Sequence, residues 1–465
     1  MTSERLAELV AERPVPGQPR PYEFPETFRT TLDNGLQVVV TPMPGRELVS
    51  ASLALRAGAA DEPADEGGAT VLAARGLTEG TEVRDAIELT EAAERLGASL
   101  HAESGWDATS AGVDVPESRL GPALELLAEV VRRPTFPESE IDRLRDERLT
   151  DLLQAKADPR RRADEAFIGT IYAPTSPYHR PSGGTSETVA GLTSAQLRDV
   201  HTRAANPRHA ALVVAGDITN DAVVALARSL FGDWSGAAAA GSSAVDDRAA
   251  TDARVVRVVH RPGAVQSEIR IGHRAVPRHT PDYHALSVMG AILGGLFNSR
   301  LNMNLREEKG YTYGASAGFD LRRGRGPFTA RAAVNTEVTV PAIHEFLVEL
   351  DRIRETSVTD AELKAARDFL VGVFPLRFET PGPVAGSLAG LFIHDLPDDE
   401  LDRYRSAIEA VTAADVQRVA RDHIRPEAAA IVVVGDHKRF GSALDEASVG
   451  AVEVVRDVEE SSEAA

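Results

Sequence analysis

The sequence contains no cysteine, which excludes several classes of chemistry at once. Disulfide bonds, iron–sulfur clusters, thiolate zinc sites and a cysteine nucleophile all require this residue. Basic residues are also scarce relative to acidic ones, because 51 Lys and Arg face 71 Asp and Glu, which gives a net charge of −20. Nucleic acids and anionic membrane surfaces bind basic proteins. The charge balance therefore argues against both as partners.

Long apolar runs are missing as well. The longest, such as residues 428–434, have the length of a strand, whereas a membrane-spanning helix needs about 18 consecutive apolar residues. Residues 1–22 carry Glu and Pro where a secretion signal has a basic start and an apolar core. These features predict a cytoplasmic protein. Its length of 465 residues suffices for two or more domains.

The sequence consists of two similar halves. Residues 192–217 and 411–436 align without a gap, with Thr193 opposite Thr412. Each segment has the pattern of a Thr-capped amphipathic helix, a Pro-containing turn and a buried strand that ends in Gly-Asp. Because both segments lie at the ends of equal halves, we predict an internal duplication in an α+β protein. Two such domains that face each other tend to form a cleft between them.

Residues 235–252 lie between the halves, are rich in Ala, Gly and Ser, and show no periodicity. This composition is typical of a flexible linker and predicts halves that fold separately and change their relative angle. The predicted organisation is a flexible arm (1–21), an N-terminal domain (22–234), the linker (235–252), a C-terminal domain (253–444) and an acidic tail (445–465). Within the tail, Val452–Val455 predicts one short strand.

Hydrophobic periodicity predicts several elements of the N-terminal half. Strands are expected at 37–41, at 48–56 and within 98–115, and helices at 83–97 and 138–154. An Asn-Gly pair before the first of these strands is a hairpin signal.

The segment 283–319 is the most informative for chemistry. Its helical spacing is interrupted at Gly294–Gly295 and then resumes as an amphipathic helix with Arg306 in the last turn. The pattern next predicts a strand with Tyr311 and Tyr313 on one face. The turn between this helix and this strand could bring the guanidinium of Arg306 and the phenol of Tyr313 to one surface. A structural role is also open, because cations at helix C-termini offset the macrodipole and strand tyrosines often pack in cores.

Two stretches of the chain resemble a known family. The run R-E-E-K-G-Y-T-Y, preceded by GGLFNSRL, resembles the C-terminal signature of the insulinase/pitrilysin metallopeptidase family, in its smaller processing-peptidase-like branch. The opening TLDNGLQVVVTPMPG and the later VSASLALRAGAADEP are similar to the family's N-terminal hairpin. The resemblance covers about residues 28–440. It implies two homologous α/β-layered domains that form half of a clamshell, and it assigns the family's Arg and Tyr to Arg306 and Tyr313.

The zinc motif of that family is degenerate in this chain. Active members have G-x-A-H-F-x-E-H, in which the two His bind zinc and the Glu activates water, but this chain reads GGATVLAARGLTEGT. Val71 and Arg75 stand at the two His positions, and Ala74 stands at the Glu position. None of them can ligate zinc or move a proton. The third family ligand, a downstream Glu, falls around Thr150–Asp151. We therefore expect no metal site and no hydrolytic centre in this chain.

The resemblance implies a non-catalytic, substrate-binding subunit of a heterodimeric zinc metallopeptidase. A paralogous partner with the H-x-x-E-H motif would hold the zinc ion. Arg306 would bind a carbonyl group of the peptide substrate, and Tyr313 would stabilise the oxyanion of the tetrahedral intermediate. The chain alone would be inactive.

Five further residues resemble the glycine-rich substrate loop of processing-peptidase regulatory subunits. They are Gly294, Gly295, Phe297, Asn298 and Ser299. A close contact between helices is the alternative interpretation of the two glycines.

Two other functions stay open. Some paralogues of the family are catalytically dead core subunits of a respiratory complex, in which the fold is a scaffold and neither Arg306 nor Tyr313 is required. A peptidase that is active by itself would need a zinc site, which the sequence lacks.

Overall fold

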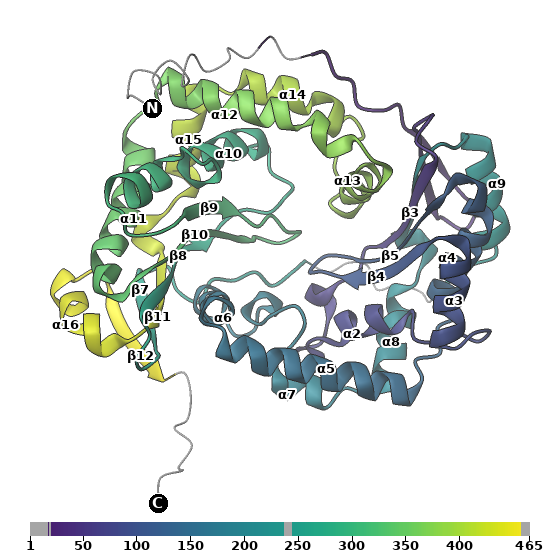
Figure 1. The fold of residues 1–465 in the computed structure, drawn as a ribbon, viewed down its shortest axis with the longest axis horizontal. Helices are drawn as coiled ribbons and strands as arrows, with labels where there is room; N and C mark the ends of the chain where they lie inside the picture. The colour runs from purple at the N-terminus through teal and green to yellow at the C-terminus, as the bar shows by residue number, and fades with distance from the viewer. Residues whose placement is uncertain (1–16, 18–19, 237–243, 457–465) are drawn as a thin grey trace, which may run out of the picture.

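The computed structural model of the chain describes residues 17, 20–236 and 244–456, and it contains one six-stranded sheet in each half (Figure 1). The first sheet has the strand order β1-β2-β6-β3-β5-β4. Its strands are β1 (Phe28–Thr31), β2 (Gln37–Pro42), β3 (Leu48–Leu55), β4 (Ser99–Ser104), β5 (Thr109–Pro116) and β6 (Ala210–Gly216). The second sheet has the order β12-β7-β11-β8-β10-β9. Its strands are β7 (Val255–His260), β8 (Gln266–Arg274), β9 (Ala315–Phe319), β10 (Pro327–Asn335), β11 (Ala430–Gly435) and β12 (Ala451–Arg456).

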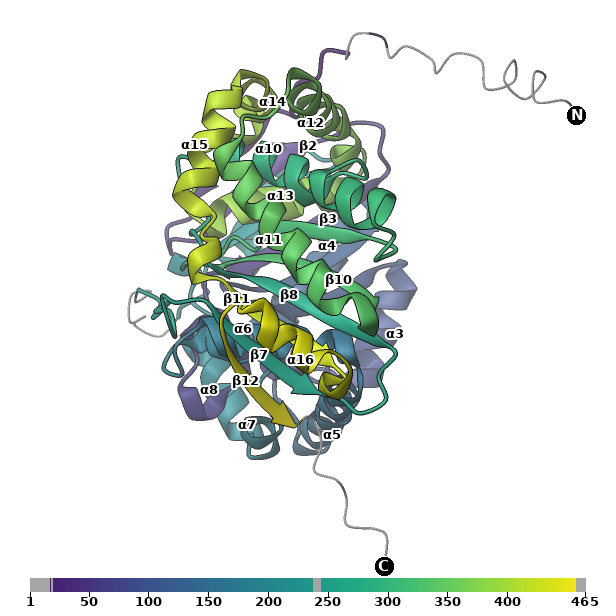
Figure 2. The same cartoon turned by 90° about the vertical axis from the view of Figure 1, so that its left-hand side faces the viewer.

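Helices surround both sheets. Those of the N-terminal half are α2 (Ala69–Gly76), α3 (Ala86–Leu96), α4 (Leu120–Arg132), α5 (Glu138–Ala157), α6 (Pro159–Ile171), α7 (Ser186–Ala190), α8 (Ser194–Ala204) and α9 (Asn220–Phe231). Those of the C-terminal half are α10 (Tyr283–Gly290), α11 (Thr339–Glu355), α12 (Asp360–Val373), α13 (Pro381–Ile393), α14 (Glu400–Ala410), α15 (Ala413–His423) and α16 (His437–Ala447). Figure 2 shows α11 and α16 on the outer side of the C-terminal sheet.

Five strands of each sheet share one topology, which confirms the duplication predicted from the sequence. In each sheet a parallel pair, β2 with β6 or β7 with β11, is continued by antiparallel partners, β3 and β5 or β8 and β10. Strand β4 or β9 then forms one edge. The copies differ at the other edge, where β1 is antiparallel to β2 but β12 is parallel to β7. Strand β12 contains the short strand predicted at Val452–Val455.

The repeated helix–strand unit explains why the match between the halves has no gap. Helices α8 and α15 both begin with a capping box, in which Thr193 Oγ1 accepts a hydrogen bond from the Gln196 N–H and Thr412 Oγ1 accepts one from the Asp415 N–H. The strands that follow, β6 and β11, are buried along their whole length in the middle of their sheets. The remaining predicted elements of the N-terminal half are also present, as β2, β3, α3, β4, β5 and α5.

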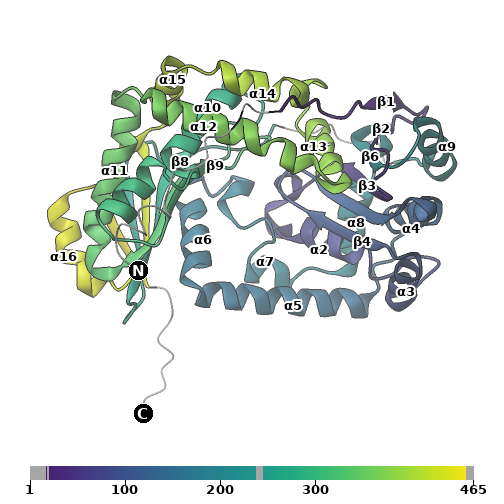
Figure 3. The same ribbon diagram turned by 45° about the horizontal axis from the view of Figure 1, so that its top comes forward.

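Each half contributes a helix to the sheet of the other half. Helix α6 packs on β8 and β11, where Phe167 and Ile171 join Val432 in one buried cluster. Helix α13 packs on β3 and β6, where Leu388 shares a buried cluster with Val213. Figures 1 and 3 show both helices between the two sheets. Since each half covers part of the other's sheet, this packing is a physical reason to expect that the halves do not fold separately, contrary to the expectation from the linker composition.

The tips of two equivalent hairpins also meet between the halves. The guanidinium of Arg322, in the β9–β10 loop, lies 4.7 Å from the ring centroids of both Trp106 and Tyr178. The Arg323 N–H donates a hydrogen bond of 2.8 Å to the carboxylate of Asp107, in the β4–β5 turn. These contacts join the two halves at the centre of the molecule.

The predicted arm (1–21) lies almost wholly outside the described residues, as do residues 237–243 of the linker and 457–465 of the tail. The described part of the linker is bound to both halves. Ala250 N–H donates to the carbonyl of Ile171 at 3.0 Å, and Asp247 pairs with Arg274 at 3.2 Å. Across the described ranges, every helix is too short or too polar to cross a membrane.

Candidate functional site

The degenerate zinc motif lies on α2, whose first turn is fixed by a buried carboxylate. Glu62 accepts hydrogen bonds from the backbone N–H groups of Gly68 and Thr70 at 3.0 and 2.6 Å. Arg180 pairs with the same carboxylate at 2.6 Å. Burial raises the pKa of Glu62, and the charge of Arg180 opposes that shift. The position of α2 is therefore set by groups outside the motif.

Val71 and Arg75 lie one helical turn apart on α2 and share a face, while Ala74 is buried. The Nη2 atom of Arg75 lies 2.7 Å from Oε2 of Glu147 on α5. Arg143 binds the other oxygen of Glu147, also at 2.7 Å. These two guanidinium groups, Arg75 first, hold the pKa of Glu147 below its ordinary value. An ion-pair network thus joins α2 to α5 at the degenerate motif.

The carboxylate that faces Arg75 is Glu147, whereas the sequence placed the third family ligand around Thr150–Asp151. Asp151 pairs instead with Arg161 at 2.8 Å, on the next helix. Glu147 and Asp151 are four residues apart and therefore lie on the same face of α5, one turn from each other. Motif spacing alone could not distinguish between these two turns.

These residues do not fit a zinc ion. Val71 and Ala74 offer no lone pair, and Arg75 carries a permanent positive charge that repels a dication. Nowhere in residues 20–236 and 244–456 do three or more His, Cys, Asp or Glu side chains converge as metal ligands would. The chemistry that this arrangement supports is ion pairing between two helices.

The segment that carries Arg306 is less regular than the sequence predicted. Helix α10 continues into two π-helical turns, Ala291–Gly295 and Asn302–Glu308, with a loop between them. The Leu296 N–H bonds to the carbonyl of Ala291 at 3.0 Å, a spacing of five residues that widens the turn. Wide turns of this type occur frequently at functional sites.

Tyr311 and Tyr313 do not lie in a strand, so this prediction is wrong. The hydroxyl of Thr312 accepts a hydrogen bond from the Gly314 N–H at 3.1 Å and donates one to the carbonyl of Ala333 at 2.8 Å. This side chain replaces the ladder bonds that a strand would need, so β9 begins only after these residues. Tyr311 packs against the core of the C-terminal half, while Tyr313 is 94% exposed.

Arg306 stacks on an aromatic ring. Its Cζ atom lies 4.2 Å from the ring centroid of Phe297, and its Nε atom lies 3.4 Å from Oε1 of Glu307. Phe297 is itself 71% exposed. Within the described ranges no hydrogen bond or ion pair joins Arg306 to Tyr313. The structure therefore brings Arg306 and Phe297 together and leaves Tyr313 apart.

The predicted substrate residues divide into exposed and buried ones. Gly295, Phe297 and Asn298 are exposed, whereas Gly294 and Ser299 are buried. A Cβ atom on Gly294 would lie 2.2 Å from the backbone nitrogen of Ala317. Gly294 thus permits close packing, as the alternative interpretation expected, but against strand β9 and not against a helix.

Sequence reasoning missed Asn302, which holds this loop in place. Its Nδ2 donates to the carbonyl of Leu296 and to the hydroxyl of Ser299, both at 3.2 Å. Its Oδ1 accepts a hydrogen bond from the Ala315 N–H at 2.9 Å. The available signal was an amide beside Leu301, on a helix face that the periodicity predicted to be buried.

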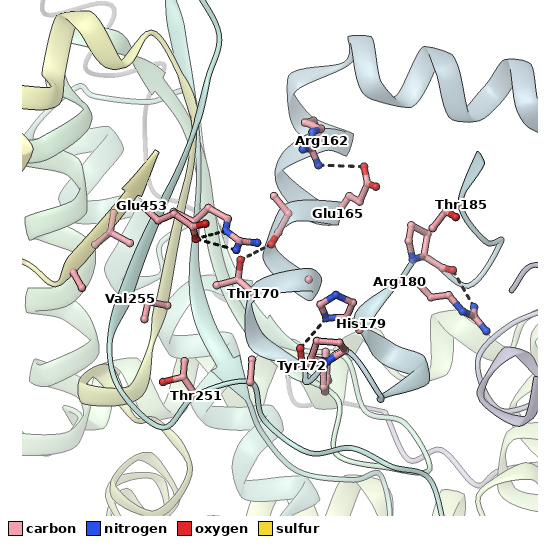
Figure 4. A pocket seen from close by; sticks show the side chains of 18 of the residues that line it. Arg162, Glu165, Thr170, Tyr172, His179, Arg180, Thr185, Thr251, Val255 and Glu453 are labelled. Carbon is pink, nitrogen blue, oxygen red and sulfur yellow. Dashed lines mark hydrogen bonds and ion pairs between the residues drawn. The ribbon is translucent and has the colours of Figure 1, made fainter. Parts of the chain in front are cut away.

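A separate hollow of about 690 Å³ lies between α6 and the β7–β12 edge of the C-terminal sheet (Figure 4). Within it, Arg257 pairs with Glu453 at 2.9 Å and Arg162 with Glu165 at 3.4 Å, whereas Arg180 pairs with Glu62 outside the lining. It contains none of the catalytic, substrate-binding or metal-site residues predicted from the sequence.

Two family models match the chain. The model described as insulinase (peptidase family M16) matches residues 37–176, and the model described as peptidase M16 inactive domain matches residues 191–370. Together they match parts of both halves of the duplication. The chain belongs to the insulinase family, peptidase family M16.

Individual relatives agree with this assignment. The chain is 28% identical over 414 residues to an uncharacterized zinc protease of Mycobacterium tuberculosis, over 88% of this chain and 93% of the relative. It is 22% identical over 431 residues to a probable mitochondrial-processing peptidase subunit beta of Arabidopsis thaliana, over 88% and 78%. A crystal structure of a peptidase M16 inactive domain from Pseudomonas fluorescens superposes with a TM-score of 0.81 at 23% identity, over 88% and 98%. This last similarity shows the fold alone.

Proposed function

We propose that the chain is the non-catalytic, substrate-binding subunit of a heterodimeric zinc metallopeptidase. The observation that carries the proposal is the ion pair between Arg75 and Glu147, at the motif where active members of the family bind zinc. None of Val71, Ala74 and Arg75 could activate water. The chain nevertheless presents Arg306 and Tyr313 on an exposed surface of the other half, as a subunit that binds peptide for a catalytic partner would.

The two side chains suit different roles toward a peptide. Arg306 is held by the ring of Phe297, so its guanidinium is oriented before it donates to a peptide carbonyl. Tyr313 is almost fully exposed, so its hydroxyl can enter a partner's active site without losing a contact within this chain. One hydrogen bond to the developing oxyanion contributes about 10²–10³ in rate. Zinc and the attacking water would belong to a paralogous partner with the H-x-x-E-H motif.

Similarity to a protein whose name includes "subunit beta" supports a paired assembly. The alternative, a scaffold without a role in catalysis, requires neither Arg306 nor Tyr313. The experiment that separates them is steady-state kinetics of the chain reconstituted with an H-x-x-E-H paralogue from the same genome. Activity is normalised to the heterodimer measured by gel filtration.

Tyr313→Phe removes one hydroxyl, and we expect kcat to fall about 100-fold with pairing and zinc content unchanged. Tyr311→Phe is the matched control, because that ring packs in the core two residues away and its loss of hydroxyl should leave kcat unchanged. Arg306→Ala should raise KM as well. Normal turnover by Tyr313→Phe and Arg306→Ala would remove the catalytic role and favour the scaffold.

A further inference from the structure

A cavity of about 540 Å³ opens between α10, the edge strand β9 and helix α12. Most of its lining is apolar, with Leu286 from α10, Phe319 and Leu321 at the end of β9, and Phe369 and Leu370 from α12. Phe369 is 47% exposed. This size lies within the range of about 300–1,000 Å³ that is typical of ligand sites.

Two glycines keep this cavity open. A Cβ atom on Gly290 or Gly318 would meet no atom within 4 Å, so no close contact explains the missing side chain. Gly290 has a helical φ of −60°, at which any residue fits. Glycine is unfavourable in a helix relative to alanine. Gly294 differs, because a Cβ atom there would lie 2.2 Å from Ala317.

The cavity has no unpaired charge among its lining residues. Arg278 pairs with Glu400 at 2.9 Å and lies 3.6 Å over the ring of Tyr283. Burial lowers the pKa of His394, which disfavours the charged form of its ring. A charged group would lose its hydration in this cavity without gaining an oppositely charged partner, which is unfavourable. An apolar group would be removed from water, which is favourable.

The cavity adjoins, in the chain, the loop that carries Phe297. Gly295 lines it and leads directly to Phe297, the ring that holds Arg306. At its other end, Leu321 and His394 also line a second hollow, which is bordered by the β4–β5 turn of the N-terminal half. A peptide bound at Arg306 that extends toward the β4–β5 turn would therefore pass over the cavity.

We propose that this cavity is a subsite for one large apolar side chain, such as that of Phe, Leu or Met, of the bound peptide. The inference rests on the proposed function, since that function supplies the peptide. Specificity for such a residue would come from this chain and not from the zinc-binding partner.

The test fills the cavity without disturbing the fold. Gly290→Leu places a side chain into the open space, and Gly372→Leu is the matched control, because Gly372 also lies in a helix and its Cβ would meet nothing within 4 Å. The probe is N-acetyl-4-fluorophenylalanine methylamide, titrated into the isolated full-length chain and followed by fluorine NMR. We expect saturable binding to the wild type and to Gly372→Leu, and binding at least about 10-fold weaker to Gly290→Leu. Both variants should keep or raise the melting temperature, because leucine favours a helix more than glycine does.

Equal binding of the probe to Gly290→Leu and the wild type, or no saturable binding to the wild type, would overturn the subsite. Neither result bears on the kinetics of Tyr313→Phe in the reconstituted pair. If the probe binds as expected while Tyr313→Phe and Arg306→Ala both turn over normally, the apolar site stands and the proposed function fails. In the reconstituted pair, Gly290→Leu should lower kcat/KM at least about 10-fold for a peptide with Phe at the matching position and leave its Asp analogue unchanged.

Discussion

The guanidinium of Arg75 on α2 lies 2.7 Å from the carboxylate of Glu147 on α5, and this ion pair joins the two helices. Side chains of both residues are about half exposed, at 40% and 46%, so the pair is screened by solvent. A pair of this kind stabilises the fold by no more than about 1 kcal/mol. Its main consequence is chemical, because it fills a position at which active relatives bind a metal.

This geometry predicts that the zinc site can be rebuilt. Val71→His, Ala74→Glu and Arg75→His together should give about one zinc ion per chain by elemental analysis after gel filtration, where the unmodified chain should give none. Two His four residues apart on one helix face can share a metal ion. Glu147 already faces position 75 and would supply the third ligand.

A control tests which of two carboxylates, Glu147 or Asp151, is the third zinc ligand of the rebuilt site. Glu147→Gln added to the triple variant should abolish zinc binding, whereas Asp151→Asn should leave it intact, because Asp151 is held by Arg161. If zinc binding is lost with Asp151→Asn and kept with Glu147→Gln, Asp151 and not Glu147 is the third zinc ligand.

The stacking of Arg306 on Phe297 predicts a coupled effect on peptide binding. Phe297→Ala should raise KM in the reconstituted pair about two- to five-fold, as expected from about 0.5–1 kcal/mol for an exposed cation–π contact. The double variant Phe297→Ala/Arg306→Ala should be little worse than Arg306→Ala alone, because the ring acts through the guanidinium. Fully additive losses would instead show that the two side chains contact peptide independently.

The exchange of α6 and α13 predicts that neither half is stable alone. Residues 20–236 and 244–456, expressed separately, should each lack a cooperative thermal transition, because α6 and α13 each cover the other half's sheet. A full chain cut at an inserted protease site near residue 240 should remain associated on gel filtration. A cooperative transition in either isolated half would contradict the prediction.

Burial of His273 predicts a loss of stability in acid. Its Nε2 accepts a hydrogen bond from the Arg425 N–H at 3.0 Å, so the folded state holds a neutral ring, and burial lowers the pKa of His273 from 6.5 to about 4. The unfolded chain binds a proton near pH 6.5 and the folded chain does not. The free energy of unfolding should therefore fall by about 2 kcal/mol between pH 7 and pH 5.

Urea unfolding at both pH values measures this effect. His273→Gln keeps an acceptor for Arg425 and cannot titrate, so its stability should depend less on pH than that of the wild type. Some dependence should persist, because burial also lowers the pKa of His201. An unchanged slope in His273→Gln would show that other groups account for the acid sensitivity.

The parts of the fold that the sequence predicted are those with local signals. Capping boxes at Thr193 and Thr412 and the periodicity of α3 and α5 depend on residues a few positions apart, so they could be identified without the tertiary structure. The exchange of α6 and α13 could not, because an apolar helix has the same pattern whichever sheet it covers.

The same limit applies to the candidate site: the sequence predicts which residue types are present, but not the local conformation of the chain. Loss of the metal motif at Val71, Ala74 and Arg75 is a matter of residue type and is visible in the sequence itself. The conformation around Tyr313 depends on which acceptor the Thr312 hydroxyl selects, and that acceptor, the carbonyl of Ala333, lies on another strand. Periodicity carries no information about such a choice.

The exchange of helices also sets an order of events during synthesis. Strand β6 completes the N-terminal sheet, but α13, which covers β3 and β6, leaves the ribosome only after strands β7 to β10 and helices α9 to α12. At about 5–20 residues per second, the apolar face that contains Ala54 and Val213 stays open for roughly 8–30 s. A chain that stops before Pro381 never covers that face, so premature termination yields a species that chaperones and proteases can recognise, and no working N-terminal domain.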